Sequence, residues 1–430
     1  MNGRDPNRDR LAFGVVTAVF FMWGFITVLN DVLVPHLKSV FALDYTRVML
    51  IQFCFFGAYF LMSLPAGKVV SALGFKNSIV VGLGVTGVGA LGFLPAAALP
   101  SYPVFLSALF ILASGITLLQ VAANPYVSLL GRPEGASSRL NLSQAFNSLG
   151  TTLAPKFGGV LILSATVLTP TALAQLPPAQ QLAYQIQQAH SVELPYIGIA
   201  VTLFLLALVV YLFHLPAVEE RVAGDEEGHP FRDALRHRHL SFAIAAIFLY
   251  VGAEVSIGSF MINYISLPGI GDMPEARAAG YVSLYWGGAM IGRFVGAALL
   301  QRIDSRKLLA VFAAVAAVLV LTTMLSAGML AVASVVAIGL FNSIMFPTIF
   351  TLGIEGLGPL TGRGSSLLVM AIVGGAILPV AQGALADAFG VHHAFLLPFL
   401  CYLYILFYAL VGSRHSSSED GATPTVRAHG

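Results

Sequence analysis

Long runs of apolar residues, separated by short polar segments, recur along the whole chain. An α-helix rises about 1.5 Å per residue and needs about 20 apolar residues to cross the hydrocarbon core of a membrane, whereas a strand of a membrane barrel would show about ten residues of alternating polarity. The runs have the first pattern and predict an all-α integral membrane protein with 12 transmembrane helices. The predicted spans are residues 11–36, 49–72, 77–98, 102–129, 141–165, 194–216, 241–266, 278–300, 307–328, 330–354, 365–386 and 393–413.

The composition agrees with a membrane protein. Of the residues, 57% are hydrophobic and 10% are charged, against about 25% charged in an ordinary soluble domain. The formal net charge of +2 argues against a nucleic-acid partner. Cys54 and Cys401 each stand alone inside a predicted span, and the sequence has no phosphate-binding loop, zinc-ligand spacing or nucleophile elbow. We therefore expect no metal, no cofactor and no enzymatic activity.

The chain divides into two similar halves at its most charged stretch, Glu219 to His239. We predict an N-terminal six-helix half (1–217), a cytoplasmic linker (218–240), a C-terminal six-helix half (241–413) and a disordered cytoplasmic tail (414–430). Two such repeats are typical of secondary transporters, whose substrate binds between the halves near mid-membrane. Matching residues recur at a constant separation in equivalent spans: Pro125 and Gly131 match Pro347 and Gly353, and Arg139, Gly150 and Pro155 match Arg363, Gly374 and Pro379.

The basic residues favour one orientation in the membrane. If the N-terminus is cytoplasmic, most Lys and Arg residues fall in cytoplasmic segments, and only Lys38, Arg47 and Arg277 fall in outer loops. Cytoplasmic loops of membrane proteins carry an excess of Lys and Arg. The distribution therefore predicts that both termini are cytoplasmic.

Two carboxylates inside predicted spans are candidates for proton coupling. Asp31 follows Asn30 in the run FFMWGFITVLNDVLVPHLKSVF, and Glu254 lies in the seventh span. An ionised carboxylate inside a membrane is costly, so such residues face a bundle interior or a watery path and often carry ions or protons. A structural role is the alternative for both residues: Asp31 would pair with Lys156, and Glu254 with Arg293.

Amide side chains in the fourth and fifth spans are candidates for binding the substrate. Asn141, Gln144 and Ser148 share one face of a helix, because residues three, four and seven positions apart fall on one side. Amides donate and accept hydrogen bonds, which suits a neutral polyhydroxylated ligand, although amides also tie membrane helices together. The predicted substrate-binding residues are Asn30, Gln120, Asn124, Asn141, Gln144, Asn147, Tyr250, Asn263 and Trp286.

A third group of residues is predicted to have structural or gating roles. The segment PAGKVVSALGFK joins the second and third spans and contains two glycines and two lysines. Tight glycine turns with basic residues fit a gating loop, and a short cytoplasmic loop that obeys the charge rule explains them equally well. The residues in this group are Gly67, Lys68, Gly74, Lys76, Lys156 and Arg293.

Several motifs together resemble one transporter family. They are LNDVLVPHLKSVF, PAGKVVSALGFK, AANPYVSLLG, RLNLSQAFNSLGTTLAP, YVGAEVSIGSF, FPTIFTLGIEGLG and the glycine pair of VGGAILP. This combination is similar to the fucose:proton symporter family of the major facilitator superfamily, and within it to the bacterial glucose/galactose transporter branch. The resemblance implies the major facilitator fold, alternating access by rocking of the two halves, and proton-coupled uptake of a monosaccharide across the bacterial inner membrane.

The resemblance also assigns roles to particular residues. Asp31 matches the first-helix aspartate that carries the proton in the family's fucose permease, and Asn141, Gln144 and Asn147 match its sugar-facing motif. The chain departs from the fucose permease at Gln120, where that protein has a glutamate, and it has Glu254 in the seventh span instead.

These patterns lead to one hypothesis with several alternatives. The hypothesis is a sugar:proton symporter that imports a neutral hexose, glucose or galactose, with the sugar, the proton and the lipid bilayer as its partners. Uptake of N-acetylglucosamine or fucose, and coupling to sodium, remain alternatives. An efflux antiporter would be expected to have a more apolar and aromatic pocket, and a non-transporting sugar sensor would be expected to carry a large soluble output region.

Overall fold

The computed structural model describes residues 6–40, 45–98, 101–161, 175–177, 179–181, 184, 193–213, 215–216 and 231–414, and the regular structure within these ranges is helical. Nine helical segments in the described part of the chain are long and apolar enough to cross a membrane. One of the nine, Phe53–Ala96, covers the second and third predicted spans.

The fifth and eighth predicted spans are not among the nine, and both are helices. They are α5 (Ala136–Leu161, 26 residues) and α11 (Glu275–Leu299, 25 residues). At about 1.5 Å per residue, helices of this length extend for nearly 40 Å and are long enough to cross a membrane. The amide side chains of α5 and the charged Arg293 of α11 lower the hydropathy of these two helices.

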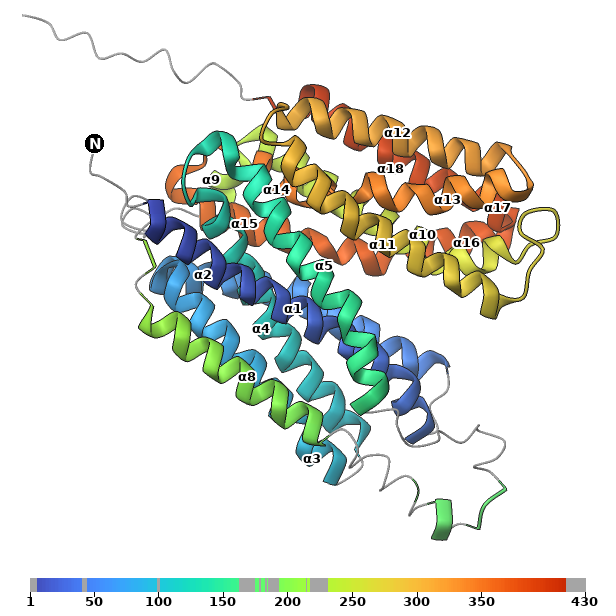
Figure 1. The fold of residues 1–430 in the computed structure, drawn as a ribbon, viewed down its shortest axis with the longest axis horizontal. Helices are drawn as coiled ribbons and strands as arrows, with labels where there is room; N and C mark the ends of the chain where they lie inside the picture. The colour runs from blue at the N-terminus through green and yellow to red at the C-terminus, as the bar shows by residue number, and fades with distance from the viewer. Residues whose placement is uncertain are drawn as a thin grey trace, which may run out of the picture.

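The helices form two bundles (Figure 1). The first bundle consists of α1 (Pro6–Val40), α2 (Tyr45–Leu91), α3 (Phe93–Ala98), α4 (Tyr102–Leu129), α5 and α8 (Glu193–Leu212). The second consists of α9 (Phe231–Leu235), α10 (Arg238–Ile265), α11, α12 (Ser305–Leu325), α13 (Gly328–Asn342), α14 (Met345–Ile354), α15 (Thr361–Met370), α16 (Gly374–Phe389), α17 (Val391–Ala394) and α18 (Leu396–Phe407). The predicted residue boundaries of the two halves and of the linker stay a prediction.

Helix α2 turns back on itself at Gly74. This glycine has φ 73° and ψ 171°, a conformation outside the helical region. Positive φ is strained for residues with a Cβ atom and open to glycine. Gly74 therefore makes the tight turn that joins two membrane-crossing segments within α2.

Two glycines allow very close packing between helices. A Cβ atom on Gly150 of α5 would overlap the carbonyl oxygen of Phe21 in α1, and a Cβ atom on Gly374 of α16 would overlap the carbonyl oxygen of Phe248 in α10. Small residues let membrane helices approach each other in this way. Gly150 and Gly374 are one of the pairs that match between the halves of the sequence, and the structure places both in the same kind of contact, each within its own bundle.

Replacing either glycine by alanine is expected to destabilise the protein. The added methyl group has no space, and overpacking of this kind costs about 1–3 kcal/mol. Thermal unfolding of the purified protein in detergent measures the effect as a lower midpoint temperature. Gly84→Ala is the matched control, because a Cβ atom at Gly84 would meet no atom within 4 Å. Equal midpoints for Gly150→Ala and Gly84→Ala would contradict the packing argument.

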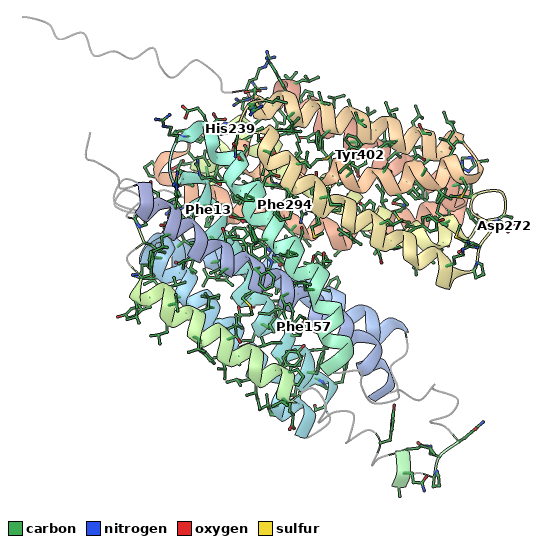
Figure 2. The ribbon with its side chains drawn as sticks, viewed as in Figure 1. Phe13, Phe157, His239, Asp272, Phe294 and Tyr402 are labelled. Carbon is green, nitrogen blue, oxygen red and sulfur yellow. The ribbon has the colours of Figure 1, made fainter. Side chains whose placement is uncertain are left out.

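The two bundles touch at one end and diverge toward the other, where α3 and α17 lie (Figure 1). We call the touching end the contact end; it carries the connections at residues 130–135, 300–304 and 355–360. Two seams run from it. In one, α5 lies against α11, the helix that carries Phe294 (Figure 2), and the ring centroids of Phe146 and Phe294 are 5.9 Å apart. In the other, α2 lies against α15, with Gly67 next to Ser366.

Candidate functional site

Glu254 of α10 is buried in the second bundle, with 9% of its surface exposed. Its carboxyl Oε1 lies 2.8 Å from the hydroxyl of Tyr250, one helical turn earlier. The same Tyr250 hydroxyl lies 3.0 Å from the main-chain oxygen of Asn342. The hydroxyl of Tyr285 in α11 donates to the main-chain oxygen of Glu254 at 3.3 Å. Glu254 is therefore held by two tyrosines from two different helices.

Asn342 stands at the centre of this network, at the last residue of α13. Its side-chain nitrogen donates to the Tyr285 hydroxyl at 2.7 Å, and its side-chain oxygen accepts from the Tyr402 hydroxyl at 2.7 Å. Tyr402 lies within the second bundle (Figure 2). Asn342 was not among the predicted site residues, although an amide inside an apolar run is the same signal that singled out the amides of α5.

Arg293 of α11 connects the two bundles. Its guanidinium group donates to the hydroxyl of Ser148 in α5, and its Nε donates to the main-chain oxygen of Ser343 at 3.3 Å. Arg293 and Glu254 attract each other electrostatically, but in the described part of the chain the Glu254 carboxyl bonds to Tyr250 rather than to Arg293. The direct pairing considered from the sequence is therefore not the arrangement that the structure has.

The amides of the first bundle differ in what they contact. Asn147 donates to the carbonyl oxygen of Phe20 at 2.9 Å, which ties α5 to α1. Asn141 donates to its own helix at Ser137 (2.9 Å) and, across the contact between the bundles, to the hydroxyl of Thr348 at 3.4 Å. These two residues join helices, as the alternative interpretation of the amides expects.

The other amides of the first bundle, Gln120, Asn124 and Gln144, make few hydrogen bonds through their side chains. Gln120 donates to the hydroxyl of Tyr59 in α2 at 2.7 Å. Both side-chain polar atoms of Asn124, and the side-chain nitrogen of Gln144, make no hydrogen bond with the described residues. All three side chains are buried. Buried polar groups are rarely left without partners, so Asn124 and Gln144 retain groups that a hydroxyl-rich ligand or water can bind.

The remaining predicted substrate-binding residues lie outside the buried amides of α4 and α5. Trp286 is 43% exposed, and its ring packs against that of Tyr285 with centroids 5.1 Å apart. Asn263 is exposed near the end of α10, whereas Tyr250 is fully buried. Asn30 and Asp31 lie in α1 and Lys156 lies in α5, but their side chains are outside the described residues.

Hydroxyl groups make many of the bonds between the bundles at the contact end. The hydroxyls of Ser137 and Thr351 lie 2.6 Å apart, and Ser305 donates to Ser137 at 3.0 Å. Ser138 donates to the carbonyl oxygen of Ala297 at 2.7 Å. Beside the seam of α2 and α15, Ser365 of α15 donates to the carbonyl oxygen of Val121 in α4 at 2.9 Å. These bonds join α4 and α5 to α11, α12, α14 and α15.

A cavity of about 620 Å³ lies between the bundles at the contact end. Its walls come from both bundles and include Ser137, Arg302, Asp304, Thr351 and Glu355. None of the predicted substrate-binding residues lines it.

A sequence profile of the Major Facilitator Superfamily matches residues 11–372. The chain belongs to the Major Facilitator Superfamily. It is similar to the "Glucose/galactose transporter" of Brucella abortus, with 53% identity over 93% of each chain. It is 45% identical to the "Putative glucose/galactose transporter" of Helicobacter pylori, over 96% of this chain and 99% of that protein. It is 36% identical to the "L-fucose-proton symporter" of Escherichia coli, over 96% and 97%.

The fold of this superfamily member also matches a solved structure. The crystal structure described as a Major Facilitator Superfamily transporter, FucP, in the outward conformation gives a TM-score of 0.87 at 36% identity, covering 94% of this chain and 98% of that one. The predicted all-α fold with the major facilitator architecture is confirmed. The prediction that the chain is a membrane transporter rather than an enzyme is confirmed by its family membership.

Four of the predicted gating residues of this superfamily protein, those of the segment PAGKVVSALGFK, lie around the turn of α2. Gly67 packs against Ser366, and Gly74 makes the turn itself. Lys68 is exposed, and the amino group of Lys76 lies 5.9 Å from the centre of the Tyr211 ring in α8. Among these residues, Gly67 is the one that meets the opposite bundle through a close contact, so it is the strongest candidate for controlling how the bundles separate.

Proposed function

We propose that this protein is a sugar:proton symporter that imports a neutral hexose, glucose or galactose, by alternating access. The near-full-length identity of 53% to a protein named as a glucose/galactose transporter is the observation that carries this proposal. The buried amides with free bonding groups support a neutral, hydroxyl-rich substrate. The 36% identity to a fucose-proton symporter supports the proton as the coupling ion.

The contact end is proposed to face the cytoplasm. Basic residues gather there, including Arg132, Arg302, Arg306 and Lys307, whereas Arg277 lies at the opposite end. The excess of Lys and Arg on cytoplasmic surfaces supports this orientation. Both termini then lie in the cytoplasm of a bacterium, the protein spans the inner membrane, and the bundles diverge toward the outside. The conformation is accordingly outward-facing, like that of the similar crystal structure described as outward.

Transport in this proposal requires the two seams to part and new contacts to form at the outer end. Asp31 and Glu254 are the proposed proton-carrying groups, and Gln120, Asn124 and Gln144 are proposed to meet the sugar. A membrane potential of 100 mV is worth about 2.3 kcal/mol per charge, enough for roughly 45-fold accumulation of a neutral sugar that enters with one proton.

Uptake by the wild-type protein in proteoliposomes tests the proposal. We expect labelled glucose or galactose to accumulate when an inward proton gradient is applied, and only to equilibrate without one. Fucose, mannose and N-acetylglucosamine are measured in parallel, and an inward sodium gradient replaces the proton gradient in a second series. Accumulation driven by sodium alone would reject the proton as the coupling ion. Accumulation of another sugar in place of glucose and galactose would reject these two hexoses as the substrates.

A further inference from the structure

The Tyr250 hydroxyl lies within hydrogen-bond distance of two oxygen atoms, and its single hydrogen can point directly at only one of them. Oε1 of Glu254 is 2.8 Å away, and the main-chain oxygen of Asn342 is 3.0 Å away. A phenol hydroxyl has one hydrogen to donate, and a main-chain carbonyl oxygen can only accept. Full bonds at both distances form when Tyr250 gives its hydrogen to the main-chain oxygen of Asn342 and receives one from Glu254. If Tyr250 gives its hydrogen to Glu254 instead, the main-chain oxygen of Asn342 loses this donor.

We propose that Glu254 carries a proton in this outward-facing conformation and donates it to Tyr250, which in turn donates to the main-chain oxygen of Asn342. The carboxyl group is the only one of the three that can supply the second hydrogen. In this form the protonated Glu254 leaves the Tyr250 hydrogen free to bond to Asn342, so α10 is tied to the last residue of α13. The helix is interrupted after this residue, and α14 begins at Met345. That this proton is the one transported with the sugar rests on the proposed function.

The rest of the network is complete in the same arrangement. Tyr402 donates to the side-chain oxygen of Asn342, the side-chain nitrogen of Asn342 donates to the Tyr285 hydroxyl, and Tyr285 donates to the main-chain oxygen of Glu254. Each of the three tyrosine hydroxyls then donates once, and no hydroxyl hydrogen is shared between two acceptors. Networks in which every buried polar group is satisfied are favoured over partly satisfied ones.

An ionised Glu254 would disturb this network. The Tyr250 hydrogen would turn to the carboxylate, and the hydroxyl oxygen and the Asn342 carbonyl oxygen would face each other at 3.0 Å with no hydrogen between them. Leaving a buried acceptor without a donor is unfavourable, and so is burying an ionised carboxylate without a bonded cation.

The groups around Glu254 come from three helices in the described part of the chain. Tyr250 belongs to α10, Tyr285 and Arg293 to α11, and Tyr402 to α18; all four interact with Glu254 electrostatically. Arg293 is the cation among them, and its attraction favours a carboxylate. Its hydrogen bonds, however, go to Ser148 and Ser343, which leaves Tyr250 as the bonded partner of the carboxyl group.

Infrared spectroscopy of the full-length protein in lipid tests the proposal directly. A protonated carboxyl group has a carbonyl stretching band that a carboxylate lacks. We expect a band of this kind at neutral pH without sugar, and its loss in Glu254→Gln, whose amide can still donate to Tyr250. If Glu254→Gln does not fold, Glu254→Asp is used, and the band should then shift rather than disappear. A spectrum in which no carboxyl band depends on Glu254 overturns the proposal.

A pair of tyrosine variants tests the direction of the bond. In Tyr250→Phe the carboxyl hydrogen loses its acceptor, so the Glu254 band should shift in frequency. Tyr402→Phe is the matched control, because it removes a buried hydroxyl that bonds to Asn342 and not to the carboxyl group. The Glu254 band should shift less in this variant than in Tyr250→Phe. Equal shifts in both variants, or none in Tyr250→Phe, overturn the proposed bond.

The outcome for this proposal is separate from the outcome for the proposed function. The spectra need neither sugar nor transport. An absent band together with proton-driven sugar uptake rejects a protonated Glu254 and leaves the symporter. If the Glu254 band is present but sugar uptake does not depend on the proton gradient, the symporter proposal is rejected, and Glu254 is a protonated structural group.

Discussion

Replacing Glu254 by glutamine is expected to give a transporter that equilibrates a sugar but does not accumulate it. Glutamine keeps a hydrogen-bond donor toward Tyr250, so the network around Asn342 stays intact. The amide cannot release a proton, so sugar movement is no longer coupled to the proton gradient. Accumulation at 100 mV should fall from roughly 45-fold to about unity, while exchange of labelled for unlabelled sugar continues.

Two further variants make this measurement specific. Glu134→Gln removes a carboxylate that is exposed in the turn before α5, and it should accumulate sugar as the wild type does. Asp31→Asn tests the other proposed proton carrier in the same assay. If Glu254→Gln accumulates sugar normally and Asp31→Asn does not, the proton is carried by Asp31, and Glu254 has no part in coupling.

Replacing Gly67 by valine is expected to drive the protein out of the proposed outward-facing conformation. A Cβ atom at this position would lie 2.8 Å from the hydroxyl oxygen of Ser366 and 2.9 Å from its Cβ atom, across the seam between α2 and α15. Overpacking costs about 1–3 kcal/mol. Because the two residues separate when the contact end opens, this cost should shift the equilibrium toward the inward-facing state by about 5-fold to 150-fold.

Labelling of a single cysteine measures that shift. Thr348→Cys, in a background with Cys54→Ser and Cys401→Ser, places a thiol at a buried position of the contact end. A membrane-impermeant thiol reagent applied from the cytoplasmic side should react faster when Gly67→Val is present. Gly57→Val in the same helix is the matched control, because a Cβ atom there would meet no atom within 4 Å. Equal labelling rates with the two valine variants would show that Gly67 does not hold the seam closed.

Sequence patterns predict the fold because the membrane leaves few alternatives. Backbone groups in lipid must be satisfied within the chain, so apolar runs of sufficient length form helices. The repeated positions also had a structural cause: Gly150 and Gly374 match between the halves, and both lie where one helix meets the backbone of another. A small residue that recurs at equivalent positions of two repeats is thus a good sign of close helix packing.

The details of the site were less predictable because they depend on residues far apart in the chain. Asn342 acquires its role from Tyr285 and Tyr402, each more than 50 positions away. Arg293 and Glu254 are a basic and an acidic residue in neighbouring spans, which suggested an ion pair, yet Arg293 donates to Ser148 of the opposite bundle. Periodicity identifies the shared face of a helix, but it does not tell which helix that face meets.

The chemistry of the contact end has a consequence for the salt dependence of transport. Some bonds described there join two hydroxyl groups, as in Ser137 with Thr351, and others join a hydroxyl group to a carbonyl oxygen, as in Ser138 with Ala297. Water molecules can take the place of either partner, so breaking such a bond changes the free energy by only about 0.5–1.5 kcal/mol. Surface ion pairs, in contrast, weaken as dissolved salt screens them. Opening of the contact end is therefore expected to depend little on the ionic strength of the cytoplasm, because the bonds that it breaks there are between neutral groups.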